Sequence, residues 1–416
     1  MKKMIGNIAV GQSGGPTAVI NASVVGIYQA AKEMGAGRVY GMVHGIQGFL
    51  ERNLILLEDY LETGSGRELL KRTPSAFLGT CRYKLPEIHG NEVVYERIFE
   101  VMEEYDIEAF FYIGGNDSMD TVKMLSDYAA EHGKKERFIG IPKTVDNDLP
   151  VTDHCPGYGS AAKYIATSLK EVIRDVQSTG LSKPTVLIVE IMGRHAGWLA
   201  AAAALAKGGD CDGADAVYLP ERVFDPDACI DHIRAAAQKK NTVVIVVSEG
   251  IRLADGRFVC ELSGSADSVD VFGHKQLSGC ALVLADMVSG ATGFKTRAIE
   301  LSTLQRSAAH MASLTDVEEA VLAGSYGVKA AAEGHTGVMT VLKRLQDQPY
   351  LCAVDIHDIH MIANREKPVP DEWITEDGRG LTEEFLRYAR PLIMGELQPL
   401  YIDGLPGHLV RKEIIS

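Results

Sequence analysis

The 416-residue sequence lacks the hallmarks of membrane and secreted proteins. Its longest run of small apolar residues, Trp198 to Ala206, is far shorter than the roughly 20 residues of a transmembrane helix. Met1-Lys2-Lys3 leads straight into a strand-like run, without the apolar core of a signal peptide. The seven cysteines are scattered and form no CxxC pair, which favours reduced thiols over a disulfide framework. We therefore expect a soluble, cytoplasmic protein.

Positive charge is also scarce. The 42 lysines and arginines face 56 acidic residues, giving a formal net charge of −14. This balance argues against nucleic acid or an acidic membrane as a partner. An anionic substrate would therefore have to be attracted locally, by a few cationic side chains or a metal ion.

Several catalytic fingerprints are missing as well. The chain has no GxGxxG dinucleotide motif after a strand, no GK[ST] P-loop ending and no HExxH metal spacing. A Rossmann dehydrogenase and a nucleotide P-loop are thereby excluded. No tandem repeat or low-complexity tract is visible.

What the sequence has is an alternation of short apolar runs and helical patterns, which predicts parallel sheets covered on both faces. The length suggests roughly two to three domains. From about Leu345, prolines interrupt the helical patterns, and we expect an appended segment there. Strands are predicted at 8–10, 39–43, 109–113, 138–141, 185–191, 216–219 and 242–247, and helices at 93–104, 118–132 and 160–178.

The most informative segment is Pro142 to Asp148, directly after the predicted strand 138–141. Ligands of open α/β sheets bind at this end of the strands. Lys143, Asp146 and Asp148 would suit an anionic substrate held by a metal ion, with one carboxylate free to take a proton. A strand-to-helix loop with an Asx turn and helix caps explains the same residues equally well.

Two glycine-rich loops follow other predicted strands, at residues 11–15 and 114–118. Glycines there let backbone N–H groups approach a phosphate, although a tight structural turn is the alternative. In the second loop Ser118 is a candidate N-cap. Asn116 could offer an oxygen to Mg²⁺, and Asp117 places a negative charge beside the phosphate cradle.

Two further loops carry polar residues. Arg194, after Met192-Gly193, could clamp a phosphate, and Glu249 could accept hydrogen bonds from sugar hydroxyls. Arg297 and Arg306 flank a strand-like run at 298–301 and could hold a sugar phosphate. Each alone is explained by a surface, capping or salt-bridging role, but four such loops at four strand ends favour a site.

In their order and spacing over residues 5–330, these segments resemble the phosphofructokinase family. The resemblance is carried by Gly14-Gly15 with Asn21-Ala22, Leu78 to Arg82, Gly114 to Ser118, Pro142 to Asp148, Met192 to Arg194, Ser248 to Gly250, and Arg297 with Gln305-Arg306. It implies an α/β fold with two Rossmann-like three-layer domains, mostly parallel sheets and an active site in the cleft between them. Residues 1–155 and 304–345 would bind the donor, residues 156–303 the sugar phosphate, and residues 346–416 would form a helical and irregular extension.

The resemblance also implies roles. The family transfers a phosphoryl group to the 1-hydroxyl of fructose 6-phosphate, with Mg²⁺ as cofactor, and is expected to form a homodimer or tetramer. Asp146 resembles the general base, Thr144 would touch the transferring group, and Asp148 would support the metal. The donor would contact Gly14, Gly15, Arg82, Gly115 and Ser118; the sugar phosphate would contact Thr144, Met192, Gly193, Arg194, Glu249, Arg297 and Arg306.

Two positions indicate which phosphoryl donor the protein uses. Asp117 and Lys143 stand where ATP-using members have glycine, which resembles the pyrophosphate-dependent branch. Asp117 would lie where the α-phosphate of ATP must go. Two unit charges about 4 Å apart at an effective dielectric constant near 20 repel by about 4 kcal/mol, roughly a thousandfold in affinity. We therefore predict pyrophosphate as donor, with Lys143 and Arg194 also acting in catalysis.

Some departures leave alternatives open. Asn116 replaces a metal-associated aspartate of the common motif. Thr185 and Thr303 replace a sugar-phosphate arginine and histidine, so sedoheptulose 7-phosphate is a conceivable acceptor. Val25 and Gln29 replace effector-binding arginines, which predicts no nucleotide allostery of that type. An ATP-dependent enzyme is the main alternative. A non-catalytic regulatory subunit fits less well because the catalytic positions are present, and the Arg194 and Gln305-Arg306 segments weigh against a NAD-kinase-like enzyme.

Overall fold

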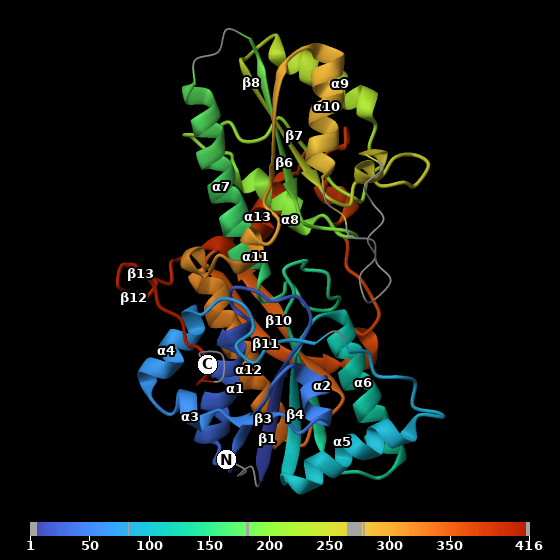
Figure 1. Ribbon diagram of the computed structural model, residues 1–416, viewed down its shortest axis with the longest axis vertical. Helices are drawn as coiled ribbons and strands as arrows, with labels where there is room; N and C mark the ends of the chain where they lie inside the picture. The colour runs from blue at the N-terminus through green and yellow to red at the C-terminus, as the bar shows by residue number, and fades with distance from the viewer. Residues whose placement is uncertain (1–5, 82, 180–182, 264–276, 278, 413–416) are drawn as a thin grey trace.

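Residues 6–81, 83–179, 183–263, 277 and 279–412 are described by a computed structural model, which has two lobes, each built on a β-sheet (Figure 1). The larger lobe holds seven strands in the order β11-β10-β5-β4-β1-β2-β3. The central strands are parallel, and only β3 and β11 at the two edges run antiparallel to their neighbours. The strands are β1 (Asn7–Gln12), β2 (Val39–Met42), β3 (Leu54–Leu56), β4 (Ile107–Gly114), β5 (Arg137–Pro142), β10 (Val338–Asp347) and β11 (Tyr350–Asp358).

Helices cover both faces of this sheet. One face packs on α1 and α12, the other on α5 and α6, as apolar residues on both sides of each central strand require. The helices of this lobe are α1 (Ile20–Glu33), α2 (Gly45–Leu50), α3 (Glu58–Leu61), α4 (Gly64–Arg72), α5 (Glu92–Glu104), α6 (Asn116–Glu131) and α12 (Leu314–Ala332).

Two glycines let α1 and α12 pack closely. A Cβ on Gly26 would lie 2.1 Å from the backbone oxygen of Val321, and one on Gly324 would lie 2.3 Å from that of Ser23. Neither oxygen can move without disturbing its helix. Glycine at these positions therefore sets the spacing of the two helices on the sheet.

The smaller lobe has four parallel strands in the order β7-β8-β6-β9. Strands β6 and β8 consist mostly of β-branched residues and are buried along their whole length, as a central parallel strand requires. The strands are β6 (Thr185–Ile191), β7 (Ala216–Tyr218), β8 (Thr242–Ser248) and β9 (Lys295–Glu300). Its helices are α7 (Tyr158–Ser178), α8 (Trp198–Ala201), α9 (Pro226–Ala237) and α10 (Cys280–Thr292), with 3₁₀ turns at Ala202–Ala206 and Val259–Ser263. The short helix α11 (Leu304–Ser307) and a 3₁₀ turn at Ala309–Met311 lead back to the larger lobe, where Ala309 packs with residues of α1 and α12.

The C-terminal part of the chain contributes to both lobes. Strand β11 lies within the predicted extension yet pairs with β10 along its length, because an exposed edge of the larger sheet accepts it. Phe385 and Tyr388 of α13 (Glu383–Ala389) are buried in the core that also holds Trp198, and Figure 1 shows α13 beside α8. The segment also contains 3₁₀ turns at Ile359–Met361, Asp371–Trp373 and Arg390–Ile393 and a hairpin of β12 (Tyr401–Ile402) and β13 (Leu405–Pro406).

The predicted α/β class with mostly parallel sheets is confirmed. All seven predicted strands and all three predicted helices are present, with ends displaced by up to a few residues. Strands β3, β10, β11, β12 and β13 were not predicted. The domain boundaries at 155, 303 and 345 stay predictions, but the segment beyond residue 345 is not solely helical and irregular, because it holds β11.

Candidate active site

Three loops meet at one edge of the larger sheet because the strands before them are parallel neighbours. Gln12 of β1 pairs with Ile113 of β4, and Gly114 pairs with Pro142 at the end of β5. The glycine-rich loops and the segment that follows Pro142 therefore emerge side by side, as the carboxyl ends of parallel strands must.

These loops line a cavity of about 680 Å³. Met192 after β6 and Arg306 of α11 also contribute, so part of the wall comes from elements beyond the larger sheet. The lining residues are Gly14, Gly15, Pro16, Gly115, Asn116, Asp117, Ser118, Lys143, Thr144, Val145, Asp146, Asp148, Met192, Arg306, Asn364 and Glu366.

Lys143 is a buried cation in this cavity, with only 2% of its surface exposed. Its Nζ donates a hydrogen bond of 2.6 Å to the backbone oxygen of Gly15. Its backbone N–H donates to Gly114, which ties the segment to the second glycine loop. Burial lowers the pKa of Lys143 to about 8, although Asp146 and Asp148 oppose the shift. The ammonium group therefore remains mostly charged at neutral pH.

Asp146 has the properties of a general base. Burial and the neighbouring charge of Asp148 raise its pKa to about 7, while Lys143 and the arginines of the cavity limit the rise. Its backbone N–H donates to Oγ1 of Thr144 at 3.1 Å, which fixes the turn. A carboxylate with a pKa near the working pH can accept a proton and release it again.

Asp148 offers an unused oxygen. Its Oδ1 is buried and has no hydrogen-bond partner among the described residues. Burial raises the pKa of Asp148, and the negative charge of Glu366 adds to this shift. A buried carboxylate oxygen without a partner is costly unless a cation or donor group from a ligand approaches it.

Asn147, between Asp146 and Asp148 in the sequence, is anchored by its own hydrogen bonds. It is fully buried and lies in the left-handed region, with φ of 55°. Its Nδ2 donates to the hydroxyl of Tyr388 at 2.8 Å, and its Oδ1 accepts from the backbone N–H of Cys155 at 2.9 Å. Both ends of the amide are thus engaged, which fixes the directions of Asp146 and Asp148.

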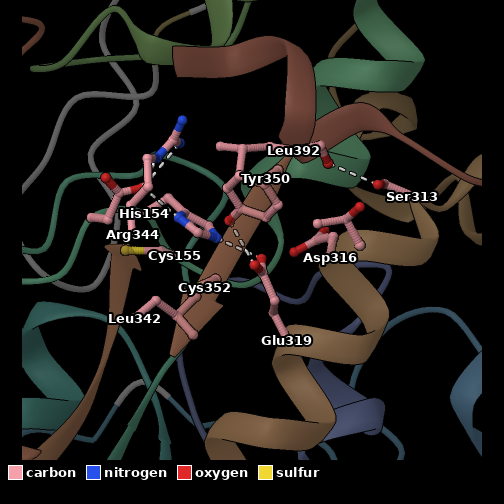
Figure 2. A network of polar contacts seen from close by, with 12 residues as sticks. His154, Cys155, Ser313, Asp316, Glu319, Leu342, Arg344, Tyr350, Cys352 and Leu392 are labelled. Carbon is pink, nitrogen blue, oxygen red and sulfur yellow. Dashed lines mark hydrogen bonds and ion pairs between the residues drawn. The ribbon is translucent and has the colours of Figure 1, made fainter. Parts of the chain in front are cut away.

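A buried ionic network supports this loop from behind. His154 contacts Oε2 of Glu319 at 2.6 Å and Oδ2 of Asp153 at 2.8 Å. Figure 2 shows Tyr350 reaching the same Glu319, which projects from α12. Burial lowers the pKa of His154, but the two carboxylates outweigh it and raise the pKa to about 9. The imidazolium therefore ties the loop to α12.

Comparison with known proteins identifies the family of this site. The sequence matches the phosphofructokinase family over residues 7–332. The chain belongs to the phosphofructokinase family. Two relatives carry the name pyrophosphate–fructose 6-phosphate 1-phosphotransferase. The one from Methylococcus capsulatus is 44% identical, covering 97% of this chain and 95% of that protein. The one from Halomonas elongata is 43% identical, covering 96% and 94%.

A solved structure agrees. The crystal structure of the pyrophosphate-dependent phosphofructokinase of Nitrosospira multiformis superposes with a TM-score of 0.88. It is 40% identical and covers 97% of this chain and 96% of that one. The likeness extends over the C-terminal part of the chain as well as over the residues that match the phosphofructokinase family.

Most residues selected by the phosphofructokinase resemblance line the cavity, but some do not. Gly193 donates its backbone N–H to Oε1 of Glu249 at 3.3 Å. Burial raises the pKa of Glu249, and the charge of Asp146 adds to the rise. Arg194 limits the rise that burial causes in the pKa of Asp146. Arg297 lies in mid-strand in β9 and pairs with Asp175 at 3.5 Å, outside the cavity of its own chain. Arg82 lies outside the described residues.

The N-cap prediction for Ser118 was wrong. Helix α6 begins at Asn116, with Gly115 as N-cap and no side-chain cap. Ser118 is instead buried against Gly114, where an added Cβ would lie 1.9 Å from Ser118 Oγ. No side chain occupies the first free N–H groups of α6, which therefore remain available at the cavity for an anion.

Sequence reasoning missed the contribution of residues 364–367. Asn364 and Glu366 line the cavity although they lie far along the chain from every family motif. Asn364 Nδ2 donates to Asp120 of α6 at 2.8 Å. Lys367 donates through its Nζ to the backbone oxygens of Thr152 and Asp153. No pattern in the local sequence predicted that residues 364–367 lie at the cavity.

The described residues contain neither a complete metal cage nor a membrane-spanning helix. No group of three or more histidine, cysteine, aspartate or glutamate side chains there could enclose a metal ion. Magnesium, however, is commonly bound by one or two carboxylates together with substrate phosphates. No helix in the described ranges is long and apolar enough to cross a membrane.

Proposed function

We propose that this protein transfers a phosphoryl group from pyrophosphate to the 1-hydroxyl of fructose 6-phosphate, reversibly and with Mg²⁺. The observation that carries the proposal is that Asp117 and the buried Lys143 line one cavity together with Asp146. The first two residues disfavour a nucleotide and favour a short anion, and the third is poised to take a proton.

The cavity suits each part of this reaction. Asp146 would take the proton of the sugar hydroxyl as the oxygen attacks phosphorus, and its pKa near 7 suits transfer in both directions. Lys143 and Arg306 would neutralise charge on the transferring group. Thr144 would stay beside that group, because its Oγ1 is held by the backbone of Asp146. Arg194 and Glu249 would hold the sugar.

Magnesium would be held at the donor end of the cavity. The unpartnered, buried Oδ1 of Asp148 is the oxygen that fits a cation best. Asn116, predicted for the metal region, also lines the cavity. When bound, Mg²⁺ would neutralise the charge of the donor phosphates. The protein residues then need only align the two substrates.

The assembly and the acceptor grip are proposed together. We infer a homodimer or tetramer in the cytoplasm, without the nucleotide allostery of regulated members. Arg297 would then contribute to a sugar-phosphate site only through a second subunit, since it faces Asp175 in its own chain.

The proposal is tested by assaying the wild type with pyrophosphate and with ATP, at equal fructose 6-phosphate and Mg²⁺. Turnover is expected with pyrophosphate and not with ATP. The double variant Asp117→Gly, Lys143→Gly should lose pyrophosphate activity and gain some with ATP. Equal use of ATP by the wild type, or full pyrophosphate turnover by the double variant, would refute the donor assignment.

A further inference from the structure

The segment 364–369 crosses the cleft and is anchored on both sides of it. Toward the larger lobe, Asn364 is bonded to Asp120. Toward the smaller lobe, the backbone oxygen of Lys367 accepts from Nε1 of Trp198 at 2.8 Å, and the backbone N–H of Val369 donates to Glu221 at 3.0 Å. We call residues 364–369 the strap. Its position is therefore fixed by several independent contacts.

Both polar atoms of the Asn116 amide are hydrogen-bonded to the strap. Nδ2 of Asn116 donates to the backbone oxygen of Arg365 at 2.6 Å, and Oδ1 accepts from the backbone N–H of Arg365 at 3.3 Å. A carboxylate could accept the second bond but could not donate the first. The structure thus explains why an amide stands here: Asn116 is a latch for the strap.

Glu366 lies between two anchored neighbours. Arg365 before it is bonded to Asn116, and Lys367 after it donates its backbone N–H to the backbone oxygen of Asp148 at 2.7 Å. Glu366 therefore bridges the gap between Asn116 and Asp148, and its exposed side chain lines the same cavity. Asp148 lines this cavity too, its buried Oδ1 has no hydrogen-bond partner among the described residues, and the charge of Glu366 acts on it.

We propose that Glu366 is a magnesium ligand, which together with Asp148 binds the ion of the metal–pyrophosphate complex. Two carboxylates and the donor phosphates satisfy Mg²⁺, which keeps several waters and needs no complete protein cage. The strap thus supplies the carboxylate that position 116 does not. This inference rests on the proposed Mg²⁺-dependent reaction and adds a residue to it.

The test is a Mn²⁺ titration of the protein followed by electron paramagnetic resonance, with imidodiphosphate as a donor that does not react. Glu366→Gln should raise the Mn²⁺ dissociation constant on the order of tenfold, the effect of one carboxylate on a divalent ion at a solvated site. Glu372→Gln, an equal charge change at an exposed position three residues beyond the strap, should leave it unchanged. Melting temperatures check that both variants fold.

A second variant tests whether the residue at position 116 serves to hold the strap or to bind the metal ion. Asn116→Asp should weaken Mn²⁺ binding, because the carboxylate repels the backbone oxygen of Arg365 and releases the strap. Tighter binding in Asn116→Asp, or wild-type affinity in Glu366→Gln, would overturn the inference. Pyrophosphate turnover by the wild type is measured separately. Its absence would refute the proposed function, whereas its presence with unaltered Mn²⁺ binding in Glu366→Gln would refute only the inference.

Discussion

Replacing Tyr388 by phenylalanine should destabilise the protein and slow its reaction. The substitution keeps the ring, which packs at 5.4 Å from Trp198 and 5.0 Å from Trp373, and removes only the hydroxyl. That hydroxyl accepts from Asn147 and donates to the backbone oxygen of Asp153 at 2.9 Å. Both bonds are therefore lost without creating a large cavity.

The two losses differ in cost. The Asp153 oxygen keeps a hydrogen bond from Lys367, so its loss should cost about 1 kcal/mol or less. Asn147 is fully buried, and its Nδ2 is left without this acceptor, which costs about 1–3 kcal/mol. We expect a total of about 1–4 kcal/mol. Because Asn147 sets the directions of Asp146 and Asp148, we also expect kcat to fall about tenfold, which corresponds to about 1.4 kcal/mol in the barrier.

Urea unfolding followed by tryptophan fluorescence measures this change, because the two tryptophans of the chain both pack against Tyr388. Tyr401→Phe is the matched control, since that ring is 64% exposed on β12. A Tyr388→Phe variant within about 0.5 kcal/mol of the wild type, the range of ordinary surface substitutions, would refute the role given to this hydroxyl.

Three other outcomes are expected. The kcat/KM for fructose 6-phosphate should fall as pH drops through about 7, where Asp146 gains a proton, and again above about 8, where Lys143 loses one; a flat profile from pH 6 to 9 would contradict both assignments. The folded pKa of His154 lies above its unfolded value, so its stabilisation is complete below about pH 6.5 and is lost as pH rises through about 9. His154→Gln should abolish that part of the pH dependence of urea unfolding. Gly324→Ala should destabilise by about 2 kcal/mol or more through its clash, whereas Gly290→Ala, with open space around it, should stabilise by up to about 1 kcal/mol; equal effects of the two would show that the helix contact is not tight.

Sequence patterns predicted the buried centre of each sheet. Strands such as β6 and β8 consist mostly of β-branched residues, and no solvent-exposed position dilutes the signal. Strands β10 and β11 were not predicted because β10 is buried only in its first half and β11 is at most partly buried, so polar residues interrupt both. Strands at or next to the edge of a sheet, such as β11 and β10, are specified by the sheet that receives them more than by their own composition.

In the site, too, some residues are indicated by the local sequence and others are placed only by the tertiary structure. Asp117, Lys143 and Asp146 stand at strand ends, where a local pattern indicates what topology will bring together. Glu366 reaches the cleft through a tertiary connection whose latch, Asn116, is about 250 positions earlier in the sequence. Arg297 illustrates the opposite failure: its type suited a phosphate, but mid-strand placement points it to Asp175. Residue type alone does not determine which surface a side chain reaches.

The strap has a consequence for synthesis on the ribosome. The loops at the ends of β1, β4 and β5 can fold early, but the contacts of Glu366 and Tyr388 require chain that is translated much later. A nascent chain that ends near residue 345 would carry the general base on a loop without its Tyr388 support and with the donor end of its cleft open. Phosphoryl transfer would therefore begin only after the C-terminal segment has packed against both lobes. An incomplete chain would then not consume pyrophosphate.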